Sequence, residues 1–121
     1  SSRNHVVDPV SQKQRRAARL SKKYLSSAKK ELGDKENFYN ALEHALHNYL
    51  KAKLSIETAE FSKESISELL QQKNSQAATI ADFISILEKC EAARYSPATA
   101  VSMEEDFNFT VQTITLLDRE I

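Results

Sequence analysis

Residues 38–50 read FYNALEHALHNYL, and the spacing of their apolar side chains predicts an amphipathic helix. Apolar residues recur every three or four positions, which places them on one side of a helix. Asp34 precedes the stretch and can cap this helix, which we expect to run to about Leu54. The predicted buried stripe consists of Phe38, Leu42, Ala45 and Tyr49, widened by Tyr39, Leu46 and Leu50.

Segments on both sides of this helix show the same periodicity. Gly33 can end a first helix in a left-handed turn, and Ser102 with Glu105 has the pattern of a capping box before the last one. The connections are about two to six residues long, which favours a compact bundle of up-and-down neighbours. We therefore predict an all-α fold of five or six helices, forming one domain over residues 11–121.

Residues 1–10 are expected to be a tether, because Pro9 bars a helix from running back through them. The expected helices cover residues 11–32, 34–54, 62–73, 75–95 and 103–121, with one or two helical turns at 56–61.

The composition of the 121-residue chain excludes several classes of protein, since it has one glycine, two prolines, one cysteine and no tryptophan. So few glycines argue against sandwiches and barrels, whose tight turns need them. A single glycine cannot form the loop that binds a phosphate or a dinucleotide, and a single cysteine cannot form an intrachain disulfide or a multi-cysteine zinc site. The chain also lacks an apolar run of the ~18 residues that span a membrane and the apolar core of a signal peptide. We expect the chain as given to be soluble.

The formal net charge of zero conceals an uneven distribution. Residues 1–30 carry nine basic residues and one acidic residue, a net charge of +8, and residues 31–121 carry a net charge of −8. Such a basic helix can be solvated, lie against nucleic-acid phosphates, or lie on an anionic lipid surface. Nucleic acid is disfavoured, because no aromatic or amide side chains alternate with the cations and the acidic remainder would repel a polyanion. We favour the lipid surface. The cationic face consists of Arg15, Arg16, Arg19, Lys22, Lys23, Lys29 and Lys30.

No group of residues indicates an enzyme, a metal or a bound cofactor. His44 and His47 are three positions apart and could share a metal, but no cysteine or third histidine lies near, so we interpret both as solvated. Cys90 lies on the apolar stripe of its helix, where a lone cysteine behaves as a small hydrophobic residue. The histidines do not allow a Ser-His-Asp triad.

Two pairs of residues leave alternatives open. Glu91 and Arg94 project onto the same side of a helix as apolar residues, so they form either a structural ion pair with a neighbouring helix or a site for a partner's carboxylate. Phe109 and Leu116 lie seven apart on the far side of the last helix. Either another helix covers them or they form an exposed docking strip.

The stretch from Cys90 to Pro97, CEAARYSP, resembles the C-E-F-A-R-Y-A-P signature of the BatD family, the bacterial aerotolerance proteins. The shared residues include Cys90, Glu91, Arg94, Tyr95 and Pro97. In this stretch Ala92 stands where the family signature has phenylalanine. The helix around residues 38–50 resembles the family's F-Y-x-A-L-x-x-A-L-W-x-Y-L pattern, with His47 in place of tryptophan. The basic stretch from residue 15 resembles the segment that follows the family's membrane helix.

This resemblance implies a location and a set of partners. The chain would be the cytoplasmic helical tail of a single-span protein of the bacterial inner membrane, which makes residues 1–10 a juxtamembrane tether. Its parent would belong to an envelope complex linked to oxygen and stress tolerance. The implied partners are membrane-anchored Bat proteins of the von Willebrand A type or a MoxR-type ATPase, and the implied role is non-enzymatic protein interaction.

Overall fold

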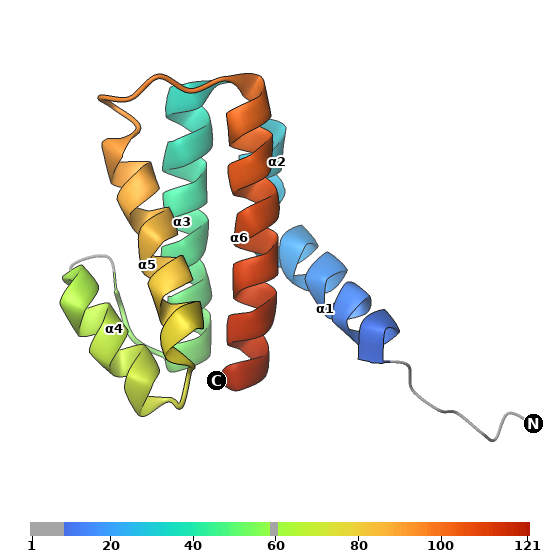
Figure 1. The fold of residues 1–121 in the computed structure, drawn as a ribbon, viewed down its shortest axis with the longest axis vertical. Helices are drawn as coiled ribbons and strands as arrows, with labels where there is room; N and C mark the ends of the chain where they lie inside the picture. Colours follow the sequence, from blue (N-terminus) through green and yellow to red (C-terminus); the bar gives the residue numbers. More distant parts are fainter. Residues whose placement is uncertain (1–8, 59–60) are drawn as a thin grey trace, which may run out of the picture.

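The third helix of the chain, built around residues 38–50, is the centre of the molecule. The computed structural model describes residues 9–58 and 61–121, and in these ranges the chain forms six α-helices with short connections and no strand (Figure 1). The predicted all-α bundle is confirmed. The helices are α1 (Pro9–Tyr24), α2 (Ser26–Lys30), α3 (Lys35–Leu54), α4 (Lys63–Gln72), α5 (Ala77–Ala92) and α6 (Ala100–Glu120).

Helix α3 has a defined cap at each end. The Asp34 carboxylate accepts a hydrogen bond from the backbone N–H of Asn37, which confirms Asp34 as the N-cap. The C-cap is Ser55, whose φ of 58° lies in the left-handed region. The predicted stripe is buried, and α3 packs against α2, α5 and α6. The fully enclosed side chains include Phe38, Leu42, Leu46, Tyr49, Leu50, Phe83, Ile114 and Leu117.

Helices α3 and α6 run in the same direction, with α5 antiparallel to both (Figure 1). Two tyrosines of α3 donate hydrogen bonds to two aspartates of α6. The Tyr39 hydroxyl lies 2.5 Å from Oδ2 of Asp106, and the Tyr49 hydroxyl lies 2.8 Å from Oδ1 of Asp118. Burial, followed by the aspartate at each hydroxyl, raises the pKa of both phenols, so they remain protonated donors.

The prediction of one continuous first helix is wrong, because the chain bends at Leu25 between α1 and α2. The Ser26 hydroxyl donates to the backbone carbonyl of Lys22, which is the kind of bond that bends a helix. The bend lets the Leu25 side chain become fully buried.

Gly33 adopts a φ of 99° and turns the chain after α2, as predicted. Helix α1 also starts earlier than expected, at Pro9, because proline is favoured at the first position of a helix. Of the predicted tether, residues 1–8 lie outside the described part.

Other predicted boundaries also need correction. The described residues of the 56–61 segment form no helix. Helix α5 begins two residues after Ser75 and ends before Tyr95. Helix α6 begins at Ala100, because Thr99 and Ser102 form the capping box that was assigned to Ser102 and Glu105.

Candidate functional site

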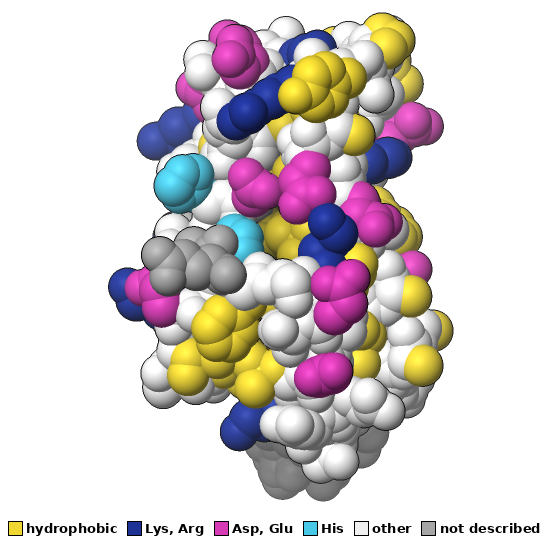
Figure 2. Space-filling view, turned by 90° about the vertical axis from the view of Figure 1, so that its left-hand side faces the viewer, with side chains coloured by type: hydrophobic (Ala, Val, Ile, Leu, Met, Phe, Trp, Pro, Cys, Tyr) yellow, Lys and Arg dark blue, Asp and Glu magenta, His cyan; other side chains and the backbone are white. Residues whose placement is uncertain are grey.

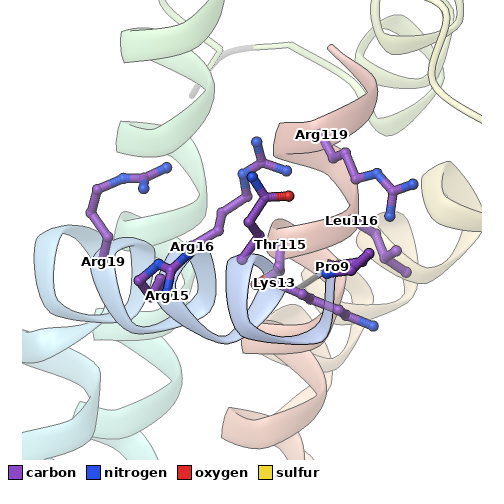
Figure 3. A pocket seen from close by; sticks show the side chains of 9 residues that line it. Pro9, Lys13, Arg15, Arg16, Arg19, Thr115, Leu116 and Arg119 are labelled. Carbon is purple, nitrogen blue, oxygen red and sulfur yellow. The ribbon is translucent and has the colours of Figure 1, made fainter. Parts of the chain in front are cut away.

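Helix α1 is unusual in how little of it is buried. Leu20 is the one buried residue among its sixteen, and the helix lies obliquely against α6 instead of running alongside it (Figures 1 and 3). Six of the seven residues assigned to the cationic face are exposed: Arg15, Arg19, Lys22, Lys23, Lys29 and Lys30. Arg16 is half-buried, because it faces α6.

Asp118 of α6 explains the position of Arg16. Its carboxylate is 8% exposed and lies 3.6 Å from Nε of Arg16, 4.0 Å from a terminal nitrogen of Arg19 and 2.9 Å from Nζ of Lys53. Burial alone would raise the pKa of Asp118, but the bonds from Lys53 and Tyr49 and the nearby cations outweigh burial and lower it. Asp118 therefore remains charged and holds α1, α3 and α6 together.

A groove of about 390 Å³ lies between α1 and the C-terminal turns of α6 (Figure 3). Arg119 forms its α6 side and was missed by the sequence analysis, because nothing in the sequence pairs residue 119 with the first helix. None of the nine described residues that line the groove is acidic. The five cations among them are Lys13, Arg15, Arg16, Arg19 and Arg119.

The side of the molecule that carries α4 has the opposite charge. Figure 2 shows acidic side chains along the middle of this face, which is the side away from α1 in Figure 1. The exposed acidic residues of α4 and α5 include Glu64, Glu68, Glu88 and Glu91. Lysine and arginine side chains also lie on this face (Figure 2), so its acidic residues form a cluster within a mixed surface, which we call the acidic side.

The interpretation of Glu91 and Arg94 as charges on an apolar stripe is wrong, because α5 ends at Ala92 and both side chains are exposed. Glu91 does pair with a neighbouring helix, since its carboxylate lies 2.8 Å from Nζ of Lys63 in α4. This hydrogen bond raises the pKa of Lys63. Within the described part of the chain, Arg94 has no ion-pair partner.

The remaining signature residues differ in their environments. Cys90 is buried, as predicted, and burial together with the nearby carboxylates of Glu43, Asp106 and Glu91 raises its pKa to about 12. Tyr95 is 87% exposed, and Pro97 is also exposed. A cavity of about 320 Å³ between α3 and the end of α5 is lined by Lys35, Glu36, Tyr39, Asn40, Cys90, Ala93 and Arg94.

The two histidines of α3 are not equivalent. His44 is exposed, as predicted. His47 is half-buried, and its Nδ1 lies 3.0 Å from Oγ1 of Thr58, a fully buried hydroxyl. The interpretation of His47 as solvated is therefore wrong, because it satisfies a polar group under the α3–α4 connection. Within residues 9–58 and 61–121, no three His, Cys, Asp or Glu side chains lie close enough to hold a metal ion.

Phe109 and Leu116 do not form a uniform strip. Phe109 is 38% exposed, whereas Leu116 is half-buried and lines the groove at α1. Helix α1 therefore crosses α6 near one of these two residues and leaves the other accessible.

Comparison with protein-family models, with curated proteins and with solved structures finds no match to this chain. The BatD resemblance remains a prediction. Among the described helices, none combines the length and the hydrophobicity that crossing a membrane requires.

Proposed function

We propose that the chain is a non-enzymatic protein-interaction domain that its basic N-terminal helix orients on an anionic membrane surface. The BatD resemblance supplies the wider context of this proposal. In that context the domain is the cytoplasmic tail of a single-span inner-membrane protein, and it acts in an envelope complex linked to oxygen and stress tolerance.

The observation that carries the proposal is the exposure of α1. A 16-residue helix that buries only Leu20 contributes little apolar surface to the core. Its sequence is instead rich in cations that point to solvent, and α2 adds Lys29 and Lys30. Each lysine or arginine held near an anionic bilayer gains on the order of 1 kcal/mol. Several cations on one side can therefore hold a small domain on a membrane.

The acidic side supports a single orientation. A negatively charged surface is repelled by anionic lipid, so the face that carries α4 and α5 would point away from the membrane. That face would remain accessible to a protein partner. The resemblance suggests a von Willebrand A-type Bat protein or a MoxR-type ATPase as the partner.

Vesicle flotation tests the membrane part of the proposal. The variant replaces Lys22, Lys29 and Lys30 with glutamine, since these side chains are exposed and lie outside the groove. Its matched control replaces Lys51, Lys73 and Arg94 with glutamine and has the same net charge. With phosphatidylglycerol vesicles at low salt, we expect the variant to lose on the order of a hundredfold in partitioning and the control to lose much less.

Equal losses for the two variants, or no loss for either, would overturn the membrane orientation. Stronger binding to DNA or RNA than to vesicles, with a steep dependence on salt, would favour the nucleic-acid alternative.

A direct binding assay tests the partner. Purified von Willebrand A-type and MoxR-type proteins from the same organism are titrated against the immobilised domain. We expect binding to one of them that is weakened by Glu64→Lys with Glu68→Lys on the acidic face. Absence of binding to both proteins would contradict the partner assignment.

A further inference from the structure

We propose that the groove between α1 and α6 is a binding site for a phosphomonoester group. The ligand chemistry is a terminal phosphate, presented by a lipid headgroup such as phosphatidic acid or by a soluble phosphate ester. The lipid form rests on the proposed function, because it adds a specific headgroup contact to a general attraction of α1 for the membrane.

The first argument is that cations from two helices line the same groove. Arg16 and Arg19 come from α1, and Arg119 comes from α6, a hundred residues later in the chain. Figure 3 shows Arg16 and Arg19 extending from α1 to the side on which Arg119 leaves α6, so that the three side chains are spread along the groove. Arginine guanidinium groups bind phosphate oxygens through paired hydrogen bonds, so arginines on both sides of a groove suit a tetrahedral anion.

The second argument is the excess of positive charge in the groove. Asp118 carries a single negative charge, and Arg16, Arg19 and Lys53 all lie within 4.0 Å of its carboxylate, so these cations exceed it in charge. Glu120 is not available to neutralise the groove, because its oxygens accept hydrogen bonds from Ser75, Thr79 and the backbone N–H of Gln76. The arginines therefore retain the capacity to bind an added anion.

Arg119 is the most informative member of the groove. Its side chain is exposed, and in the described part of the chain it forms no ion pair within 4 Å, although its charge acts on neighbouring Glu120. It also lies outside the cationic face of α1 and α2. Its contribution can therefore be separated from the general charge of the first helices.

The third argument concerns the charge and size of the ligand. A phosphomonoester carries about −1.5 to −2 charges near pH 7 and offers three acceptor oxygens, whereas a diester headgroup carries a single charge. A groove of about 390 Å³ has room for a phosphate and an attached glycerol. Pro9 and Leu116 provide an apolar edge on which the remainder of a glycerolipid can lie.

The lipid arm of the test compares vesicles that contain phosphatidic acid with vesicles that contain phosphatidylglycerol at matched surface charge. We expect the wild type to prefer phosphatidic acid by about tenfold, which is the size expected for one well-placed charged hydrogen bond. Arg119→Gln should abolish this preference and leave binding to phosphatidylglycerol nearly unchanged. The matched control Lys29→Gln has the same net charge and should weaken binding to both vesicles equally.

The soluble arm titrates glycerol 3-phosphate into the wild type and follows backbone amide resonances by NMR. Shifts confined to the groove residues of α1 and α6, and absent in Arg119→Gln, are expected. Groove shifts without a preference for phosphatidic acid would assign the site to a soluble phosphate ester. Circular dichroism of both variants checks that the fold is unchanged.

Two results would overturn the phosphomonoester site. One is equal binding to the two vesicle types together with no groove shifts on addition of glycerol 3-phosphate. The other is that Arg119→Gln reduces the preference for phosphatidic acid over phosphatidylglycerol by no more than Lys29→Gln does. Either result leaves the flotation test of the cationic face unaffected, so failure of the groove is distinguishable from failure of the proposed function.

Discussion

Asp118 is the residue on which the position of the basic helix depends. It is a nearly buried carboxylate that contacts α1 through two arginines and α3 through Tyr49 and Lys53. A buried charge is stabilising only when its hydrogen-bonding partners are in place. Here the partners come from segments about 100 and 65 residues earlier in the chain.

We predict that Asp118→Asn lowers the free energy of unfolding by about 1–3 kcal/mol, because the amide cannot replace the charged bonds that this nearly buried carboxylate makes to Lys53, Arg16 and Arg19. Denaturant unfolding monitored by circular dichroism measures the change. The control is Glu57→Gln, which removes an exposed ion pair with Lys51 and should cost less than about 0.5 kcal/mol. A similar cost for both variants would contradict the central role of Asp118.

The same carboxylate makes a prediction about pH. The pKa of Asp118 is lower in the folded protein than in the unfolded chain, so the unfolded state binds more protons in acid. The stabilisation is complete above the unfolded pKa of about 4 and is lost as the pH falls through the folded pKa. We therefore expect wild-type stability to decrease as the pH falls below about 5, and to decrease less steeply in Asp118→Asn. Identical pH profiles for the two proteins would show that Asp118 does not contribute to the pH dependence of the free energy of unfolding.

Cys90 gives a prediction about reactivity. Its thiol is buried and its pKa is raised to about 12, so the nucleophilic thiolate is scarce at pH 8. We expect modification by a disulfide reagent to be slow in the native protein and to become fast once denaturant is added. Rapid modification of the native protein would contradict the burial of this side chain.

At the residue scale, the sequence predicted the roles that depend on local pattern. The apolar stripe containing Cys90 and the cap formed by Asp34 follow from helical spacing alone. The role of Arg119 did not follow, because it depends on which helix packs against α6. The pairing of His47 with Thr58 also escaped prediction, since it requires the chain to turn back after α3.

At the scale of an element, α5 has its N-terminus capped by another helix. Its own N-cap residue, Gln76, makes no capping bond with its side chain. Glu120 of α6 instead accepts hydrogen bonds from the Gln76 N–H and from the hydroxyls of Ser75 and Thr79. A carboxylate at a helix N-terminus is also favoured by the helix dipole.

We predict that Glu120→Ala frays the first turn of α5. Hydrogen exchange of the backbone amides between Ala77 and Ile80 should become faster, and the free energy of unfolding should fall by about 1–2 kcal/mol. Glu104→Ala is the control, because this exposed acid near the start of α6 takes part in no ion pair of the described chain. Unchanged exchange in this turn of α5 would contradict the capping role.

The sequence predicted which segments form helices better than it predicted the residues at which those helices begin and end. The periodicity of residues 11–32 is continuous across Leu25, so a single helix was the expectation. At the bend the Ser26 hydroxyl bonds to the carbonyl of Lys22 and the Leu25 side chain is fully buried, and the apolar periodicity alone reveals neither feature. Similarly, Ser55 and Asn74 adopt positive φ without being glycines, so the shortage of glycine did not reveal these turns.

At the scale of the whole molecule, α1 contributes to the core only through its last two turns, with Leu20 buried and Tyr24 packed against the core. We predict that removal of residues 1–19 leaves a folded helical bundle, because Leu20 and all other buried residues are retained. Loss of the two arginines at Asp118 should lower the melting temperature by roughly 5–15 °C. The shortened chain should no longer float with phosphatidylglycerol vesicles. Loss of cooperative unfolding would instead make α1 an integral part of the core.

The pair of bonds from Tyr39 to Asp106 and from Tyr49 to Asp118 has a consequence for the uniqueness of the fold. Apolar side chains recur along both helices, so apolar packing alone would tolerate a slide of α6 along α3 by one turn, about 5.4 Å. Such a slide would separate both tyrosine hydroxyls from their acceptors at once and leave two buried polar groups without these bonds. The two hydrogen bonds therefore favour a single position of α6 along α3, because a shift by one turn would break both of them.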